Sequence, residues 1–344
     1  MDKLNMHWLF VPCVIFQRIG RPPMDTANTT AFDRSRGLSL DDLLPESQRV
    51  HTPEPEYEIY EPEHLPATRR HRPCWRRWTI YVALVMLTPL VLSEMMTLSY
   101  RWFTPPRTSF MLQDEGPIAY QYVDLDHISR YMIAAVIAHE DQRLGMRAGG
   151  VEISDLTSKA REYMDGDAGV GGSTVPQQLV KNIFLWPGRS AIRKGLEAVM
   201  ATEFSYSMSD QRILELYLNY AQFGPGLNGV CAASWYYFNT PPWFMSEYNA
   251  NQLSGVLPRP AYIERAADGG IYLGPDADQL AIEKVDIAAR FNPGSIASLG
   301  GWEGTVATVG ITDSALDHAE ERGEDSCSTM PDSVAERLIS DGFR

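Results

Sequence analysis

The chain has 344 residues, an ordinary globular composition and a formal net charge of −14 at pH 7. Its length allows one sizeable domain with extensions, or two modest domains. The acidic balance excludes general affinity for nucleic acid, because a phosphate backbone requires a basic surface, so any phosphate site must be local. The four cysteines are far apart and no two histidines stand at ligand spacing, so we expect no metal site built by the protein alone.

Residues 1–77 precede the first long apolar segment. The part from Asp25 to Ala67 is rich in Pro, Glu, Asp and Thr and has few apolar residues from which to build a core. A basic cluster, Arg69 to Arg77, follows it. We therefore predict an arm that is largely disordered and basic at its end.

The apolar segment 78–98 has about the twenty residues that a bilayer core requires. The basic cluster lies on its N-terminal side, so the positive-inside rule leaves the arm in the cytoplasm and exports the rest of the chain. Trp75, Trp78 and Trp102 fit an interfacial belt. A buried core helix is the alternative, but such a helix rarely carries this basic flank. We predict one transmembrane helix, followed by a polar connector over residues 99–125.

A helix is predicted from His127 onwards, because apolar residues recur there at helical spacing. It ends at Glu140 and Asp141, where a carboxylate faces the unfavourable end of the helix dipole. Partial burial there would raise the pKa of Glu140, which suits a general base or acid. The alternative is that these two residues merely end a helix.

The segment from Gly172 to Asn182 is the second candidate for a functional site. Thr174 and Gln177 form a capping-box pattern, and Pro176 stands in the first helical turn, where proline is tolerated. A helix that starts in this way directs free N–H groups at an anion, and three basic residues follow, namely Lys181, Arg189 and Arg193. The alternative is a capped surface helix with solvated basic residues.

Further helices are predicted from Ser209 towards Gly224, over residues 229–237 and over residues 246–256. The glycine-rich segment 149–171 is predicted to be a mobile flap. Beyond residue 292 the apolar periodicity fades, and we predict that residues 292–344 form a poorly ordered acidic tail. The folded domain, residues 126–291, is therefore expected to be almost entirely helical.

Five motifs then occur in one order along the chain: Glu140 to Gly149, Gly171 to Gln178 with Lys181 and Asn182, Arg193 to Glu197, Ile213 to Asn219, and Phe223 to Gly226. In this order they resemble glycosyltransferase family 51, the peptidoglycan glycosyltransferases that also occur as modules of class A penicillin-binding proteins. No Ser-x-x-Lys motif follows Tyr262, so we expect the monofunctional form.

The resemblance implies a mostly α, lysozyme-like domain with a small membrane-proximal lobe, anchored in the bacterial inner membrane with the domain on the periplasmic side. It implies a reaction that joins lipid II to a growing glycan strand by an inverting β-1,4 bond and releases undecaprenyl pyrophosphate. It also makes cell-division or elongation proteins expected partners. A lysozyme-like glycan-cleaving enzyme and an inactive lipid II or cell-wall scaffold are the alternatives.

By the same resemblance, Glu140 is the general base. Glu197 is the second catalytic residue and lies with Lys181 and Arg189 where the pyrophosphate and a divalent cation, Mg²⁺ or Mn²⁺, would sit. The remaining residues expected to bind substrate are Asp141, Arg143, Ser173, Thr174, Gln177, Gln178, Asn182 and Arg193. The first motif departs from the family pattern at Leu144, where a Phe is usual, and at Arg147, where a His is usual. These departures put the packing around Glu140 in question.

Overall fold

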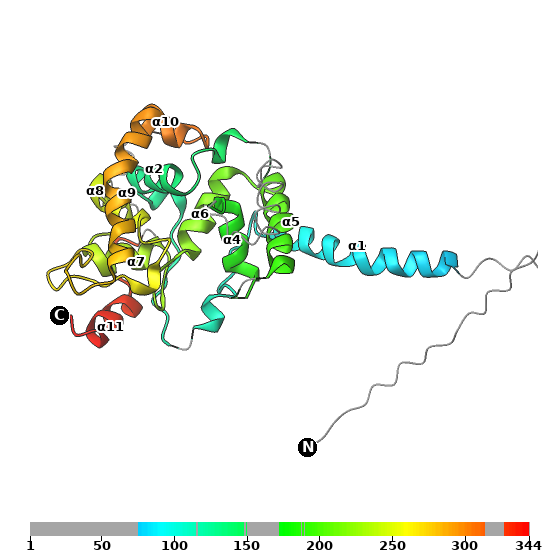
Figure 1. Cartoon of the computed structure of the whole chain (residues 1–344), viewed down its shortest axis with the longest axis horizontal. Coiled ribbons are helices and arrows are strands. Elements are labelled where there is room, and N and C mark those ends of the chain that lie inside the picture. Colours follow the sequence, from blue (N-terminus) through cyan, green and yellow to red (C-terminus); the bar gives the residue numbers. More distant parts are fainter. Residues whose placement is uncertain are drawn as a thin grey trace, which may run out of the picture. The chain divides into compact units, whose positions relative to one another are not determined.

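The computed structural model describes residues 75–114, 116–147, 149, 172–186, 188, 190–313 and 327–343 (Figure 1). The predicted arm up to residue 74, most of the predicted flap and Arg189 lie outside the described residues. The described residues are mostly helical and include one two-stranded sheet. The predicted mostly α class is confirmed.

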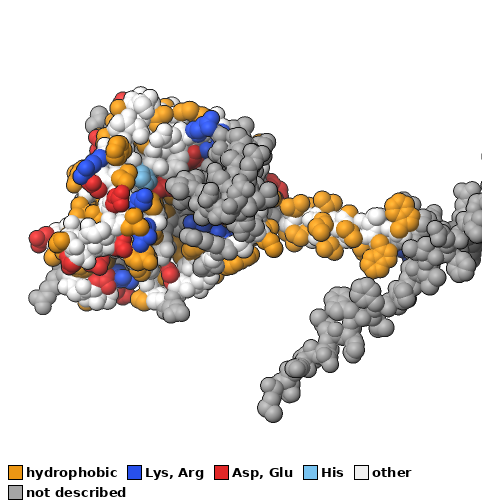
Figure 2. Space-filling view, viewed as in Figure 1, with side chains coloured by type: hydrophobic (Ala, Val, Ile, Leu, Met, Phe, Trp, Pro, Cys, Tyr) orange, Lys and Arg blue, Asp and Glu red, His pale blue; other side chains and the backbone are white. Residues whose placement is uncertain are grey.

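Helix α1, Trp75–Ser99, is continuous through Pro89, and its apolar side chains are exposed along its length (Figure 2). Residues 77–99 are long and apolar enough to span a membrane. The C-terminal part of α1 contacts α5, Ala191–Ser207. Glu94, the acidic residue of the apolar segment, accepts a hydrogen bond from Ser207 at 2.5 Å, so a partner on α5 satisfies its carboxylate.

Helix α2, Arg130–Glu140, lies at the centre of the core and is capped by the Ser129 side chain. Residues 132–138 are all buried, which is typical of an interior helix that is apolar on every side. Around it pack α8, Glu247–Ser254, α9, Gln279–Ser298, and α10, Gly301–Ala307 (Figure 1). This packing fixes the end of α2, where Glu140 lies.

A second group of helices consists of α4, Val175–Phe184, α5 and α6, Asp210–Tyr220. It adjoins α1 through α5 (Figure 1). Helix α4 begins with the predicted capping box, in which the Thr174 hydroxyl accepts from the Gln177 backbone and the Gln177 side chain accepts from the Thr174 N–H. The local sequence therefore sets the position at which α4 starts.

A short hairpin, β1 Gln222–Gly224 and β2 Leu227–Asn228, leads into α7, Val230–Phe238. Gly226 turns the hairpin with a φ of +64°, and a side chain there would meet the Pro117 carbonyl at 2.7 Å. Short 3-10 turns complete the described chain: η3 Met111–Gln113, η4 Leu125–His127, η5 Leu144–Met146, η6 Pro242–Phe244 and η7 Pro260–Tyr262.

The predicted connector is wrong over its second half. Met111, Ala119 and Val123 are buried in the same core as α2, and the Ala119 backbone pairs with the hairpin at Gly226 and Asn228. The segment is polar overall, which predicts a connector, but its few apolar residues are buried from a 3-10 turn at Met111 and from non-helical backbone at Ala119 and Val123. The domain therefore begins before residue 126.

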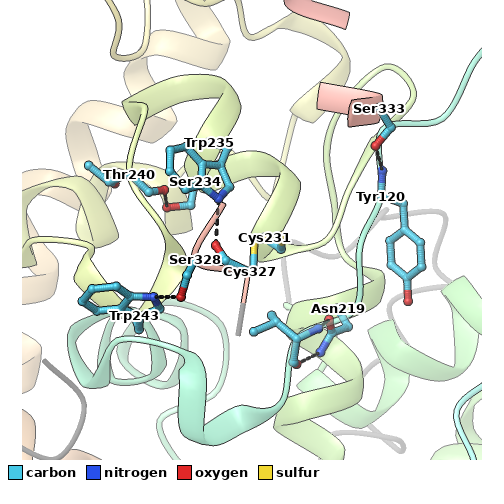
Figure 3. Close-up of a disulfide and its surroundings, with 11 residues drawn as sticks. Tyr120, Asn219, Cys231, Ser234, Trp235, Thr240, Trp243, Cys327, Ser328 and Ser333 are labelled. Atoms are coloured by element: carbon cyan, nitrogen blue, oxygen red, sulfur yellow. Dashed lines mark hydrogen bonds between the residues drawn. A yellow bond between two sulfur atoms is a disulfide. The ribbon is translucent and has the colours of Figure 1, made fainter. Parts of the chain in front are cut away.

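The predicted disorder of residues 292–344 is also wrong for the described part. Helix α9 runs through Asn292 to Ser298, α10 follows it, and α11 spans Asp332–Ser340. A disulfide joins Cys231 of α7 to Cys327, and the Trp235 indole donates to the Cys327 carbonyl at 2.9 Å (Figure 3). These tertiary contacts, rather than the local periodicity, order the C-terminal segment.

Candidate active site

Glu140 is the last residue of α2, and its side chain is only 11% exposed. Gln178 of α4 donates from Nε2 to Glu140 Oε2 at 2.5 Å, and the Tyr217 hydroxyl of α6 donates to Gln178 Oε1 at 3.1 Å. His139 Nε2 lies 3.8 Å from the other oxygen, Oε1. Burial raises the pKa of the Glu140 carboxyl and outweighs the opposing effects of Gln178, His139 and Lys181.

Asp141, the next residue, is held by the arginine that departs from the family motif. Arg147 donates from both terminal nitrogens to the two Asp141 oxygens, at 2.6 and 2.5 Å. Asp141 Oδ2 also accepts from the Val175 N–H at 3.0 Å, at the start of α4. Leu144, the other departure, is buried. The bidentate pair therefore ties the end of α2 to the beginning of α4.

A second carboxylate, Glu197 of α5, is 1% exposed. Lys194 forms a short ion pair with its Oε1, and Arg193 lies 3.5 Å from its Oε2. Lys194 also donates to the Ser173 hydroxyl at 2.9 Å, which connects α5 to the loop before α4. Lys194 lies in the motif from Arg193 to Glu197 but is not among the residues predicted to bind substrate, and its i, i+3 spacing to Glu197 is the local signal for this pairing.

Lys181 lies between the two carboxylate sites. Burial lowers the pKa of its ammonium group, while Glu197 and Glu140 both act to raise it. Gln178 and Lys181 stand three residues apart on α4 and so share one face of the helix. One helix face therefore serves both the buried carboxylate Glu140 and the cationic group around Glu197.

Other sequence-predicted residues occupy different positions. Thr174 and Gln177 are engaged in the capping box, and Gln177 is buried, so their contacts are those of a helix start. Asn182 donates to the Tyr220 carbonyl at 3.4 Å. Arg143 is exposed in the turn before η5. The structure thus brings together the following predicted residues: Glu140, Asp141, Ser173, Gln178, Lys181, Arg193 and Glu197.

The described residues do not fit a resident metal ion. No group of three or more His, Cys, Asp or Glu side chains suited to a metal occurs in the described part of the chain. Glu197, the one carboxylate expected near a cation, has Lys194 on one oxygen and Arg193 near the other. Three cationic side chains around a single carboxylate favour an anion as the ligand.

The sequence is similar to one family of known proteins. The sequence profile of the family described as transglycosylase matches residues 111–274. A biosynthetic peptidoglycan transglycosylase of Shewanella frigidimarina is 43% identical over 183 residues, which cover 53% of this chain and 79% of the relative. Proteins of the same name from a Marinomonas species and from Rhizobium etli are 39% and 34% identical, over 54% and 59% of this chain and 77% and 87% of theirs.

The fold and the site define a mostly helical, lysozyme-like enzyme domain preceded by one helix that is able to span a membrane. With relatives matched over most of their length, the chain belongs to the transglycosylase family. The match begins at Met111, which agrees with the buried position of that residue and places the domain start before the predicted residue 126.

Proposed function

We propose that the protein polymerises peptidoglycan glycan strands from lipid II. The acceptor sugar hydroxyl attacks the anomeric carbon of the growing strand, and the undecaprenyl pyrophosphate leaves with inversion, giving a β-1,4 bond. The arrangement around α4 supports this proposal most strongly. One face of α4 contacts both a buried carboxylate and a cationic group on neighbouring helices.

Glu140 suits the role of general base. Its burial raises its pKa, so the carboxylate is a stronger base than an exposed one. The Gln178 amide holds one oxygen, and Tyr217 fixes the orientation of that amide through its other end. A base oriented by α4 and α6 needs little rearrangement to accept the proton of the attacking hydroxyl.

Lys181, Arg193 and Lys194 suit a pyrophosphate leaving group. Fixed cations stabilise the negative charge that develops as the bond to the leaving group breaks. Glu197 keeps Lys194 and Arg193 in place through its two oxygens, which is a positioning role. We expect Arg189, which lies outside the described residues, to act with this group.

A divalent cation, Mg²⁺ or Mn²⁺, is proposed to enter with the substrate pyrophosphate, because the described residues do not fit a resident ion. Magnesium commonly binds substrate phosphates with few protein ligands. When bound, it neutralises charge on the pyrophosphate. In electron paramagnetic resonance, we expect the protein alone to leave the signal of free Mn²⁺ unchanged, and the protein with pyrophosphate to lower it further than pyrophosphate does without protein.

The catalytic domain is proposed to lie outside the cytoplasmic membrane, with the N-terminus in the cytoplasm. The basic cluster from Arg69 to Arg77, at the N-terminal side of the apolar segment, supports this orientation through the positive-inside rule. The Cys231–Cys327 disulfide supports it independently, because disulfides persist mainly in oxidising compartments. Cell-division or elongation proteins are the proposed partners in that location.

The test is incubation of the full chain, in detergent, with labelled lipid II and Mg²⁺. A polymer that a muramidase degrades to disaccharide units supports β-1,4 polymerisation. Release of fragments from finished cell wall without polymer would instead support the glycan-cleaving alternative. Binding of lipid II with neither product would leave the scaffold alternative, and either of these results would overturn the proposed function.

A further inference from the structure

A line of buried polar side chains leads from α9 and α8 to Glu140. The Ser254 hydroxyl of α8 donates to the Asn251 carbonyl at 2.8 Å and accepts from Asn292 Nδ2 at 2.9 Å. Asn292 Oδ1 lies 3.3 Å from His139 Nδ1. Asn292 is 3% exposed and belongs to α9, which begins after residue 274, where the family match ends.

These contacts fix the orientation of Asn292 and the tautomer of His139. The Ser254 proton is committed to the Asn251 carbonyl, so Ser254 Oγ can only accept from the Asn292 amide nitrogen. The Asn292 oxygen must then face the histidine, and an amide oxygen only accepts. His139 Nδ1 therefore carries a hydrogen, and Nε2 is the nitrogen that faces Glu140.

The tautomer links the proton on His139 to the charge on Glu140. With Nδ1 protonated, a neutral imidazole presents a lone pair to Glu140 Oε1, 3.8 Å away, whereas an imidazolium presents an N–H. The other charged groups that face Glu140 are Lys181 of α4 and Asp141. A protonated His139 therefore favours an ionised Glu140.

We propose that His139 is a positioning residue for the glycosyl transfer. Asn292 orients it, and its imidazolium keeps Glu140 ionised and aligned as the base. Helix α9, outside the matched domain, is thereby part of the active-site machinery. The inference rests on the proposed function for its role in catalysis, whereas the link between His139 and Glu140 rests on the contacts alone.

The kinetic test is the pH dependence of kcat/KM for lipid II polymerisation. In His139→Leu the imidazolium is lost, so the acidic limb of the profile moves to higher pH by about one pH unit, which is about a tenfold loss at the lower pH values. The variant and the parent protein converge at high pH, where Glu140 is ionised in both. KM changes little, because His139 acts through Glu140.

Two substitutions at one position separate this role from packing. Asn292→Leu removes the acceptor for His139 Nδ1 and moves the acidic limb in the same direction, by a smaller amount. Asn292→Asp keeps an acceptor for His139 Nδ1 and adds a negative charge. The acidic limb of its kcat/KM profile therefore lies at the same pH as that of the parent protein or at a lower pH. Equal losses of kcat at every pH in His139→Leu and both Asn292 variants, with an unmoved limb, would overturn the proposal.

A second readout needs no substrate. In the full chain, labelled at histidine ¹³Cε1 and held in detergent micelles, the His139 resonance is identified by its loss in His139→Leu. At fixed pH its chemical shift changes in Glu140→Gln, because the carboxylate 3.8 Å from Nε2 becomes an amide, and in Asn292→Leu, because the acceptor for Nδ1 is lost. An unchanged chemical shift in both variants would overturn the inference. If the chemical shift changes but the parent protein makes no polymer from lipid II, the His139–Glu140 link is supported and the proposed function is overturned.

Discussion

The bidentate pair between Arg147 and Asp141 gives the first prediction. The side chains are 9% and 4% exposed, so Arg147→Met leaves a carboxylate buried without its ionic partner. Breaking a buried pair from one side costs about 3 to 5 kcal/mol of unfolding free energy. For a domain of this size the loss corresponds to a fall in Tm of roughly 6 to 20 °C.

The assay is thermal unfolding of the detergent-solubilised protein, followed by circular dichroism. Arg290→Met is the matched control, because the Arg290–Asp286 pair is exposed and is expected to change Tm by no more than about 2 °C. Adding Asp141→Asn to Arg147→Met should recover part of the loss, since the asparagine still accepts from the Val175 N–H. Unfolding of Arg147→Met and Arg290→Met at the same temperature would show that the Arg147–Asp141 pair does not stabilise the fold.

Three further predictions follow from burial and connectivity. Cys231 and Cys327 are 96 residues apart, so their disulfide restricts the unfolded chain strongly. Replacing both by alanine should lower the free energy of unfolding, measured with urea, by up to about 4 to 5 kcal/mol. An unchanged urea midpoint would show that the disulfide does not stabilise the fold in this way. Burial raises the pKa of Glu140, so its charged form destabilises the folded state above that pKa. Glu140→Gln should therefore raise Tm at pH 8. The gain in Tm should vanish as the pH falls towards 4.5, the ordinary pKa of a glutamate side chain. Lys181→Met should lower kcat/KM for polymerisation about 100-fold, because a cation near the leaving group is lost. Tm should not fall, because the substitution removes a buried charge. A change in KM alone would count against a role of Lys181 with the leaving group.

The sequence was sufficient for elements whose signals are local. The membrane-length apolar segment, the end of the buried helix at Glu140 and the capping box of Thr174 and Gln177 are all found where they were predicted. The helix end and the capping box depend on residues within a few positions of one another, and the membrane-length segment is one continuous apolar run, so the local sequence determines all three.

The parts that depend on distant contacts were not predictable in the same way. The end of α9 is one example, because Asn292 and Ile296 are buried in a helix that packs against α2 and α8, and the local sequence does not reveal these partners. The partner of Cys231 could not be deduced from spacing. The sequence shows that Arg147 departs from the motif, but only the fold shows that it reaches both oxygens of Asp141.

Removal of the proton from the attacking sugar hydroxyl by Glu140 is tested most directly with two variants. The rate of lipid II polymerisation by Glu140→Gln is compared with that of Glu203→Gln, a matched change at a glutamate that is hydrogen-bonded to Ser93 of α1. We expect Glu140→Gln to lose about 10²- to 10⁴-fold in kcat while still binding lipid II, and Glu203→Gln to retain its rate. Polymerisation by Glu140→Gln at the rate of the parent protein would show that Glu140 is not the base.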